Sequence, residues 1–179
     1  MKKRVILIPL FILAMGTVSA QQATSIYDYK LTDVNGKTYD LSELKGKKAL
    51  IVNTASKCSL TSQVTEMEKL YEDFRDNLVI IAVPSNDFGN QEPGSNEEIK
   101  SFVKENNLTF PVMAKTSVKG DSEEPLYKWL TQKDLNGTMD TEVAWNYQKY
   151  MIDENGKLVG IVEPKESLDS DKVKEWLEK

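Results

Sequence analysis

The chain has 179 residues, a length typical of one domain, and 40% of them are hydrophobic, which is enough to bury a core. It contains no histidine and one cysteine, Cys58. These counts exclude Ser-His-Asp and Cys-His catalytic groups, histidine metal sites, a CxxC redox pair, an internal disulfide and a cysteine metal cluster. Any chemistry must therefore use carboxylates, lysines, hydroxyls, amides or this one thiol.

The N-terminal segment has the pattern of a targeting sequence. Positions 2–4 are basic, positions 5–15 are apolar, and positions 18–20 are small residues suited to signal-peptidase cleavage. The apolar run is too short for the roughly 20 residues that span a bilayer, so we expect no stable membrane anchor. The pattern predicts a signal peptide over residues 1–20, a domain over 21–179, and an exported protein that is periplasmic or secreted.

Removing this segment changes the charge of the protein. Residues 1–20 hold three basic and no acidic residues, so the net charge of the remainder would be −8 instead of −5. An acidic domain without basic clusters repels phosphate backbones. We therefore expect no nucleic-acid partner.

The first half of the domain alternates between strand and helix signals. Residues 27–31 and 37–40 flank Asn35-Gly36, a turn signal that predicts a β-hairpin. Apolar runs over 49–54 and 78–83 are typical of strands that are covered on both faces. The helix between them has its apolar residues at helical spacing: Val64, Met67, Tyr71 and Phe74.

The second half continues the pattern. The capping box from Ser95 to Glu98 opens a helix, and residues 123–131 form another. Residues 145–152 and 157–162 form strands joined through Asn155-Gly156. A last helix has three apolar residues on its inner face: Val173, Trp176 and Leu177. This order predicts an α/β fold with one parallel crossover and a sheet that finishes antiparallel.

Cys58 follows the first core strand and precedes a helix that we expect to begin near residue 60 or 61. The unpaired N–H groups and partial positive charge of a helix N-terminus favour a thiolate. The alternative is a small buried hydrophobic residue, the usual role of a lone cysteine. Its neighbours are polar: Ser56, Lys57 and Ser59. They favour the reactive thiol.

Three segments then show a family resemblance. Residues 51–58 (IVNTASKC), 86–98 (NDFGNQEPGSNEE) and 144–147 (AWNY) resemble the motifs of the glutathione peroxidases, and the similarity extends from about residue 27 to 179. The chain is similar to the cysteine-containing, non-selenium members. The resemblance implies a thioredoxin-like fold, in which helices flank a central mixed sheet and a β-hairpin lies at the N-terminus.

The resemblance also implies a catalytic set: Cys58, Gln91, Trp145 and Asn146. Amide and indole N–H groups around a sulfur stabilise its anion, orient a peroxide and stabilise the departing alkoxide. Taken alone, the tryptophan would be core packing, the glutamine a loop residue and the asparagine a turn or edge residue. The implied activity is a thiol-dependent peroxidase that reduces hydrogen peroxide and organic hydroperoxides through a cysteine sulfenic acid.

Two departures from the family pattern bear on this activity. Many cysteine-type members carry a resolving cysteine on the helix that matches residues 99–104, and this chain has none there. It would then need an external reductant, such as glutathione, another low-molecular-weight thiol or a thioredoxin-like protein, and no bound cofactor. Asp87 replaces an amide; facing Cys58 it would disfavour the thiolate, and facing solvent it would matter little. These departures leave open a non-catalytic peroxide sensor or binding protein.

The length of the segment 131–143 and the positions of the acidic residues bear on the oligomeric state and on metal binding. The segment over 131–143 is shorter than in tetrameric relatives, which predicts a monomer, with a weak dimer as the alternative, and a site open enough to admit bulky lipid hydroperoxides. Acidic residues on predicted helices, such as those in Glu66-Met67-Glu68, are interpreted as a solvated face. We expect no metal site.

Overall fold

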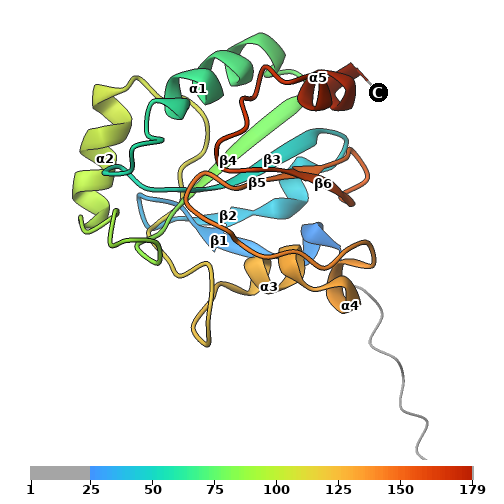
Figure 1. The fold of residues 1–179 in the computed structure, drawn as a ribbon, viewed down its shortest axis with the longest axis horizontal. Helices are drawn as coiled ribbons and strands as arrows, with labels where there is room; N and C mark the ends of the chain where they lie inside the picture. The colour runs from blue at the N-terminus through green and yellow to red at the C-terminus, as the bar shows by residue number, and fades with distance from the viewer. Residues whose placement is uncertain (1–24, 179) are drawn as a thin grey trace, which may run out of the picture.

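The computed structural model describes residues 25–178, in which a four-stranded sheet lies between two layers (Figure 1). The signal peptide predicted over residues 1–20 lies outside the described residues. The strands are β1 (Lys30–Thr32), β2 (Thr38–Asp40), β3 (Lys48–Thr54), β4 (Leu78–Pro84), β5 (Lys149–Ile152) and β6 (Leu158–Val162). The helices are α1 (Gln63–Phe74), α2 (Asn96–Glu105), α3 (Pro125–Thr131), α4 (Lys133–Asn136) and α5 (Asp171–Glu178). Short 3₁₀ turns cover Ile26–Asp28 and Leu41–Leu44.

The sheet has the order β4-β3-β5-β6 and mixed direction. β3 and β4 are parallel and joined through α1, whereas β5 pairs antiparallel with both β3 and β6. This confirms the predicted α/β class, with one parallel crossover and an antiparallel finish. The β1–β2 hairpin is confirmed as well. It begins at Lys30, later than expected, because the preceding residues form a 3₁₀ turn.

Alternating side chains of the buried strands build one core on each face of the sheet. In β3, Leu50 and Val52 pack with residues of α1 and α5, whereas Ala49 and Ile51 pack with residues of α3. Figure 1 shows α1 and α5 above the sheet, and α3, α4 and the hairpin below it. Coverage of both faces explains why the β3 and β4 sequences are apolar runs without alternation.

Helix α1 corrects two expectations. Its first residue is Gln63, later than predicted, because residues 59–62 form turns in which the Thr61 hydroxyl lies 2.9 Å from the Ala55 carbonyl oxygen and 2.6 Å from that of Cys58. The expectation of solvated acidic residues in Glu66-Met67-Glu68 holds for Glu66, which is exposed, but is wrong for Glu68, which is buried. The Glu68 carboxylate accepts hydrogen bonds from the backbone N–H and the hydroxyl of Thr109, which compensates its burial.

The strand predicted over 145–152 begins only at Lys149. Tyr147 has a φ of +69°, in the left-handed region that bulky residues rarely adopt, and this breaks the extended conformation. Its backbone N–H donates to the Asn53 carbonyl (2.7 Å), and the Asn53 amide donates to the Trp145 carbonyl (3.0 Å). Residues 145–148 are therefore fixed against the end of β3 as an irregular segment.

Across residues 25–178, no helix is both long and apolar enough to span a bilayer.

Candidate active site

Three separate segments meet at the end of the sheet where β3 and β4 have their carboxyl termini. Because β3 and β4 are parallel, the loops that follow them, with Cys58 and Gln91, leave from the same edge. Because β5 runs antiparallel to β3, the segment 145–148 that precedes it lies at that edge too. The carboxyl edge of an open α/β sheet is where ligands bind as a rule. The topology therefore gathers the residues of all three motifs.

Cys58 lies in a turn between β3 and α1, and its side chain is only 6% exposed. The turn is closed by the Cys58 N–H, which donates to the Ala55 carbonyl (3.3 Å). The Leu60 N–H points at the sulfur and donates to Sγ at 3.4 Å. A backbone donor of this kind stabilises negative charge on sulfur. The thiol therefore lies just below the surface with a polar group directed at it.

Gln91 and Asn146 are in direct contact. The Asn146 Nδ2 donates to Gln91 Oε1 at 3.0 Å and to the Phe88 carbonyl at 3.3 Å, so both of its amide hydrogens are used. This bond engages the oxygen of the Gln91 amide and leaves its Nε2 group free of Asn146. Asn146 is fully buried, whereas Gln91 is partly exposed. In this structure the Asn146 side chain therefore binds the Gln91 side chain directly.

Trp145 lies at the surface, with 41% of its side chain exposed. Its ring packs against Phe88, with 5.5 Å between the ring centroids, and the Lys119 ammonium lies 4.4 Å from the Phe88 centroid. Tryptophan is enriched at interfaces because it combines a large apolar ring with an N–H donor. The Trp145 indole is therefore available to a molecule approaching this edge.

Glu92 is a further residue near the site that sequence reasoning missed. Its side chain is 3% exposed, and its carboxylate accepts hydrogen bonds from the Ser56 N–H (2.7 Å) and Ser56 Oγ (2.8 Å). The adjacent Lys57 N–H donates to the Gln91 carbonyl (2.9 Å). A glutamate before Pro-Gly is typical of an exposed loop, so nothing in the sequence distinguished it.

Asp87 adopts neither orientation considered from the sequence. Its Oδ2 accepts hydrogen bonds from Ser85 Oγ (2.9 Å), Ser117 Oγ (3.0 Å) and the Val118 N–H (2.6 Å). The carboxylate therefore binds the loop after residue 115 to the end of β4, which is a structural role.

Two buried titratable groups lie in or beside the segment 145–148. Burial raises the pKa of Tyr147, and the charges of Cys58 and Glu92 raise it further; its hydroxyl stays protonated and donates to the Ala55 carbonyl (3.2 Å). Burial lowers the pKa of Lys149 to about 8. The Lys149 ammonium donates to the carbonyls of Glu163 (3.2 Å), Pro164 (3.0 Å) and Glu166 (3.0 Å), which stabilise its charge.

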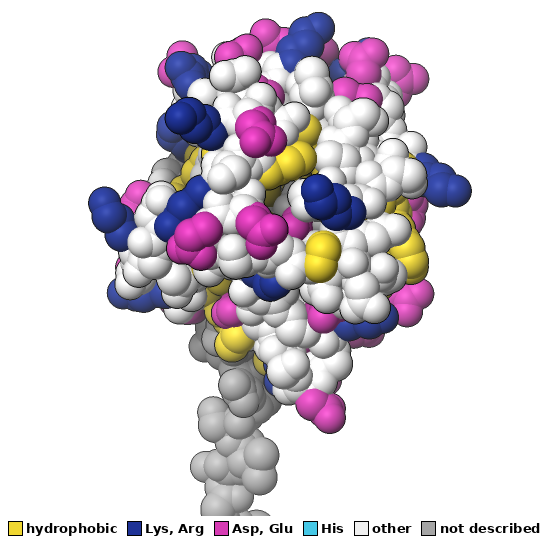
Figure 2. All heavy atoms as spheres, turned by 90° about the vertical axis from the view of Figure 1, so that its left-hand side faces the viewer, with side chains coloured by type: hydrophobic (Ala, Val, Ile, Leu, Met, Phe, Trp, Pro, Cys, Tyr) yellow, Lys and Arg dark blue, Asp and Glu magenta, His cyan; other side chains and the backbone are white. Residues whose placement is uncertain are grey.

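The surface around the site is of mixed charge. Figure 2 shows the side of the molecule on which α2 lies, where acidic and basic side chains alternate and hydrophobic patches are small. Within residues 25–178, no group of three or more Cys, Asp or Glu side chains is placed to hold a metal ion.

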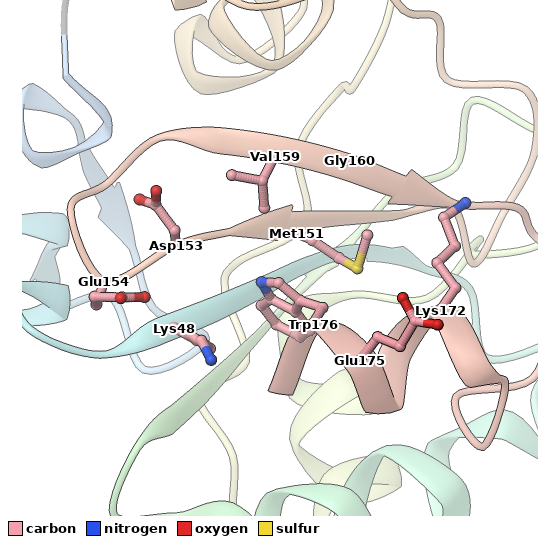
Figure 3. Close-up of a pocket in the computed structure, with 9 residues that line it drawn as sticks. All are labelled: Lys48, Met151, Asp153, Glu154, Val159, Gly160, Lys172, Glu175 and Trp176. Atoms are coloured by element: carbon pink, nitrogen blue, oxygen red, sulfur yellow. The ribbon is translucent and has the colours of Figure 1, made fainter. Parts of the chain in front are cut away.

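A cavity of about 590 Å³ lies at the opposite end of β3, between the sheet and α5 (Figure 3). It is lined by Lys48, the first residue of β3, and by Met151, Gly160, Trp176 and charged side chains of both signs. A seven-residue strand is about 20 Å long. The cavity is therefore separate from Cys58, and its size does not identify it as the active site.

Comparison with known proteins identifies the family. A family model described as glutathione peroxidase matches residues 26–131. The glutathione peroxidase homolog BsaA of Staphylococcus epidermidis is 39% identical over 157 residues, which cover 87% of this chain and 98% of that protein. The chain belongs to the glutathione peroxidase family. It is therefore a thiol-dependent peroxidase, and the alternative of a non-catalytic sensor is not favoured.

Solved structures support the same fold. The crystal structure of Trgpx in its apo form is 34% identical and superimposes with a TM-score of 0.68, covering 88% of this chain and 97% of that one. A thiol:disulfide interchange protein of the thioredoxin family from Chlorobium tepidum is 21% identical with a TM-score of 0.61, covering 87% of this chain and 94% of that one. At that identity the likeness concerns the fold alone, and it confirms the thioredoxin-like architecture.

Proposed function

We propose that Cys58 is the peroxide-reducing nucleophile of this family member, and that Gln91, Trp145 and Asn146 complete its site. The observation that carries the proposal is the convergence of the three segments at the carboxyl edge of β3 and β4, with the Gln91 amide fixed by Asn146. None of these groups needs an imidazole. The absence of histidine is therefore compatible with the chemistry.

The cycle has three steps. The Cys58 thiolate attacks the O–O bond of ROOH, which forms a sulfenic acid and, with a proton, releases ROH. A reducing thiol R′SH condenses with the sulfenic acid, giving a mixed disulfide and water. A second R′SH releases R′SSR′ and restores the thiol. The reaction consumes one hydroperoxide and two thiols and yields an alcohol (or water), water and a disulfide.

The donors act on the first step. The Trp145 indole and the Gln91 Nε2 group are neutral N–H donors that stabilise negative charge on sulfur and then on the departing oxygen. Asn146 contributes by holding Gln91. Donors of this kind cannot compete as nucleophile or base.

The reductant must come from outside the chain. Cys58 is its one cysteine, so no internal disulfide can form. We propose glutathione, another small thiol or a thioredoxin-like protein as the electron donor, and no bound cofactor. Substrates are hydrogen peroxide and organic hydroperoxides, including bulky lipid hydroperoxides.

The test is a peroxidase assay on the protein and on Cys58→Ser. Hydrogen peroxide and an organic hydroperoxide are each combined with glutathione and with a thioredoxin system. We expect turnover with at least one pair and none in the serine variant. Turnover that survives Cys58→Ser would refute the mechanism, and oxidation of Cys58 without turnover under every thiol would revive the sensor.

We further propose that residues 1–20 direct export, that the protein acts in the periplasm or outside the cell, and that it is a monomer. N-terminal sequencing of protein from the exported fraction tests the first point, since cleavage after Ala20 leaves Gln21 as the first residue. Light scattering after gel filtration tests the monomeric state. A mass of twice that of the chain would contradict it.

A further inference from the structure

Three hydrogen bonds join the two residues before Cys58 to Gln91 and Glu92. Ser56 donates two hydrogen bonds to the Glu92 carboxylate, at 2.7 and 2.8 Å, and the next residue, Lys57, donates its N–H to the Gln91 carbonyl at 2.9 Å. Cys58 follows Lys57 directly in the sequence, and Gln91 is the residue whose carbonyl accepts the Lys57 bond. These bonds therefore join the backbone just before Cys58 to the backbone at Gln91 and to the carboxylate of Glu92.

We propose that Glu92 is a positioning residue, which holds the Cys58 turn in register with Gln91 by binding Ser56. The proposal rests on the assignment of Cys58 and Gln91 given above. A buried carboxylate costs free energy unless strong hydrogen bonds compensate it, and here both come from one residue of the Cys58 turn.

Glu92 is itself held from other directions. Its backbone N–H donates to Asn86 Oδ1 at 2.9 Å, and its carbonyl lies 3.4 Å from the Lys115 ammonium, which also contacts the carbonyls of Pro93 and Gly94. Because the Glu92 backbone is held by these bonds, its carboxylate can fix the position of Ser56. Its partner Ser56 belongs to the turn that the Cys58 N–H closes by donating to the Ala55 carbonyl.

A positioning role makes a specific kinetic prediction. Attack on a peroxide requires the sulfur, the O–O bond and the N–H donors to be aligned, and a displacement of about 1 Å costs on the order of 100-fold in rate. Alkylation by iodoacetamide requires an accessible thiolate and not this alignment. The ratio of the oxidation rate to the alkylation rate of Cys58 therefore reports alignment, separately from thiolate population.

The chain supplies a matched control. Glu68 is also buried, and its carboxylate also binds the backbone N–H and the hydroxyl of a single residue, Thr109, but it does so between α1 and the loop after α2. Glu92→Gln and Glu68→Gln thus remove the same kind of interaction. The two variants differ because the partner of Glu92, Ser56, belongs to the Cys58 turn, whereas the partner of Glu68, Thr109, does not.

The experiment measures both rate constants over a range of pH for the wild type, Glu92→Gln, Glu68→Gln and Ser56→Ala, with thermal unfolding of each. We expect the ratio to fall about tenfold or more in Glu92→Gln, by less in Ser56→Ala, and to stay within about twofold of wild type in Glu68→Gln. Equal ratios in the two glutamine variants would overturn the proposal.

If Glu92→Gln does not fold, Ser56→Ala decides, because it keeps the carboxylate and its bond to the Ser56 N–H. A severalfold fall in the ratio supports the role, and an unchanged ratio overturns it. The result is distinguishable from a failure of the proposed function. If Cys58→Ser abolishes turnover while Glu92→Gln keeps the wild-type ratio, the nucleophile stands and only the positioning role is refuted.

Discussion

The contact between Asn146 and Gln91 gives a prediction that can be worked out from the structure. Asn146→Leu keeps the size of this fully buried side chain but removes both amide hydrogens. The Gln91 Oε1, 3.0 Å away, loses this donor, and the Phe88 carbonyl, 3.3 Å away, keeps only its bond from the Gln91 backbone N–H at 3.4 Å. No charge is added, so electrostatic repulsion of the thiolate does not complicate the result.

Two magnitudes follow. Each lost hydrogen bond contributes about 1 kcal/mol net, and leucine also removes the Asn146 Oδ1, which is buried without a hydrogen-bond partner, so we expect the free energy of unfolding to fall by about 1–2 kcal/mol. The Gln91 amide also becomes free to rotate, and loss of one fixed donor to developing charge costs about 10²-fold in rate. Oxidation of Cys58 by hydrogen peroxide is therefore expected to slow by about that factor.

The assays are urea unfolding and single-turnover oxidation of Cys58 in a stopped-flow instrument. Gln91→Leu and the double variant complete a cycle. If Asn146 acts through Gln91, the double variant is no slower than either single variant. Additive losses in the cycle, or an Asn146→Leu oxidation rate within threefold of wild type, would refute this reasoning.

Three further predictions concern neighbouring residues. Trp145→Phe keeps the packing on Phe88 but deletes the indole donor, so peroxide oxidation of Cys58 should slow by about 10²-fold; an unchanged rate would remove Trp145 from the mechanism. Asp87→Asn should lower the free energy of unfolding by about 1–2 kcal/mol through weaker bonds to the loop after residue 115, with little change in oxidation rate; a tenfold faster oxidation would show that its charge acts on Cys58. Between pH 8 and 10.5 the unfolded chain retains a proton on Lys149 that the folded chain has lost, so this residue makes the free energy of unfolding rise with pH in that window. Lys149→Met should remove that rise in pH-dependent urea unfolding, and an identical slope would contradict the assignment.

The sheet was predictable because its signals are local. The runs over β3 and β4 are apolar enough to indicate strands covered on both faces, and the Asn-Gly turns fix both hairpins. Trp145 and Tyr147 have strand propensity and predict a strand over the segment 145–148. Its left-handed Tyr147 depends on bonds to Asn53 and Ala55, about ninety residues away, which no local pattern contains.

The candidate site was predictable only through the family motifs. Taken singly, a surface tryptophan, a loop glutamine and a buried asparagine have ordinary explanations. The burial of Glu92 and Glu68 could not be foreseen, since each depends on one distant hydroxyl residue, Ser56 or Thr109. Acidic residues in a loop and on a helix are usually solvated.

Residues near both ends of the described chain form hydrogen bonds at the end of the sheet where β3 begins, opposite the thiol. The Tyr27 hydroxyl donates to the Glu154 carbonyl in the β5–β6 turn (2.9 Å), and the Lys48 ammonium donates to the Leu177 carbonyl (3.0 Å). In Figure 1 the first blue turn and the end of α5 lie on the side away from the loop between β3 and α1. An affinity tag, a fused domain or attachment to an electrode behind α5 therefore leaves the approach of peroxide and reductant open. The protein is suited to immobilisation without redesign of its site.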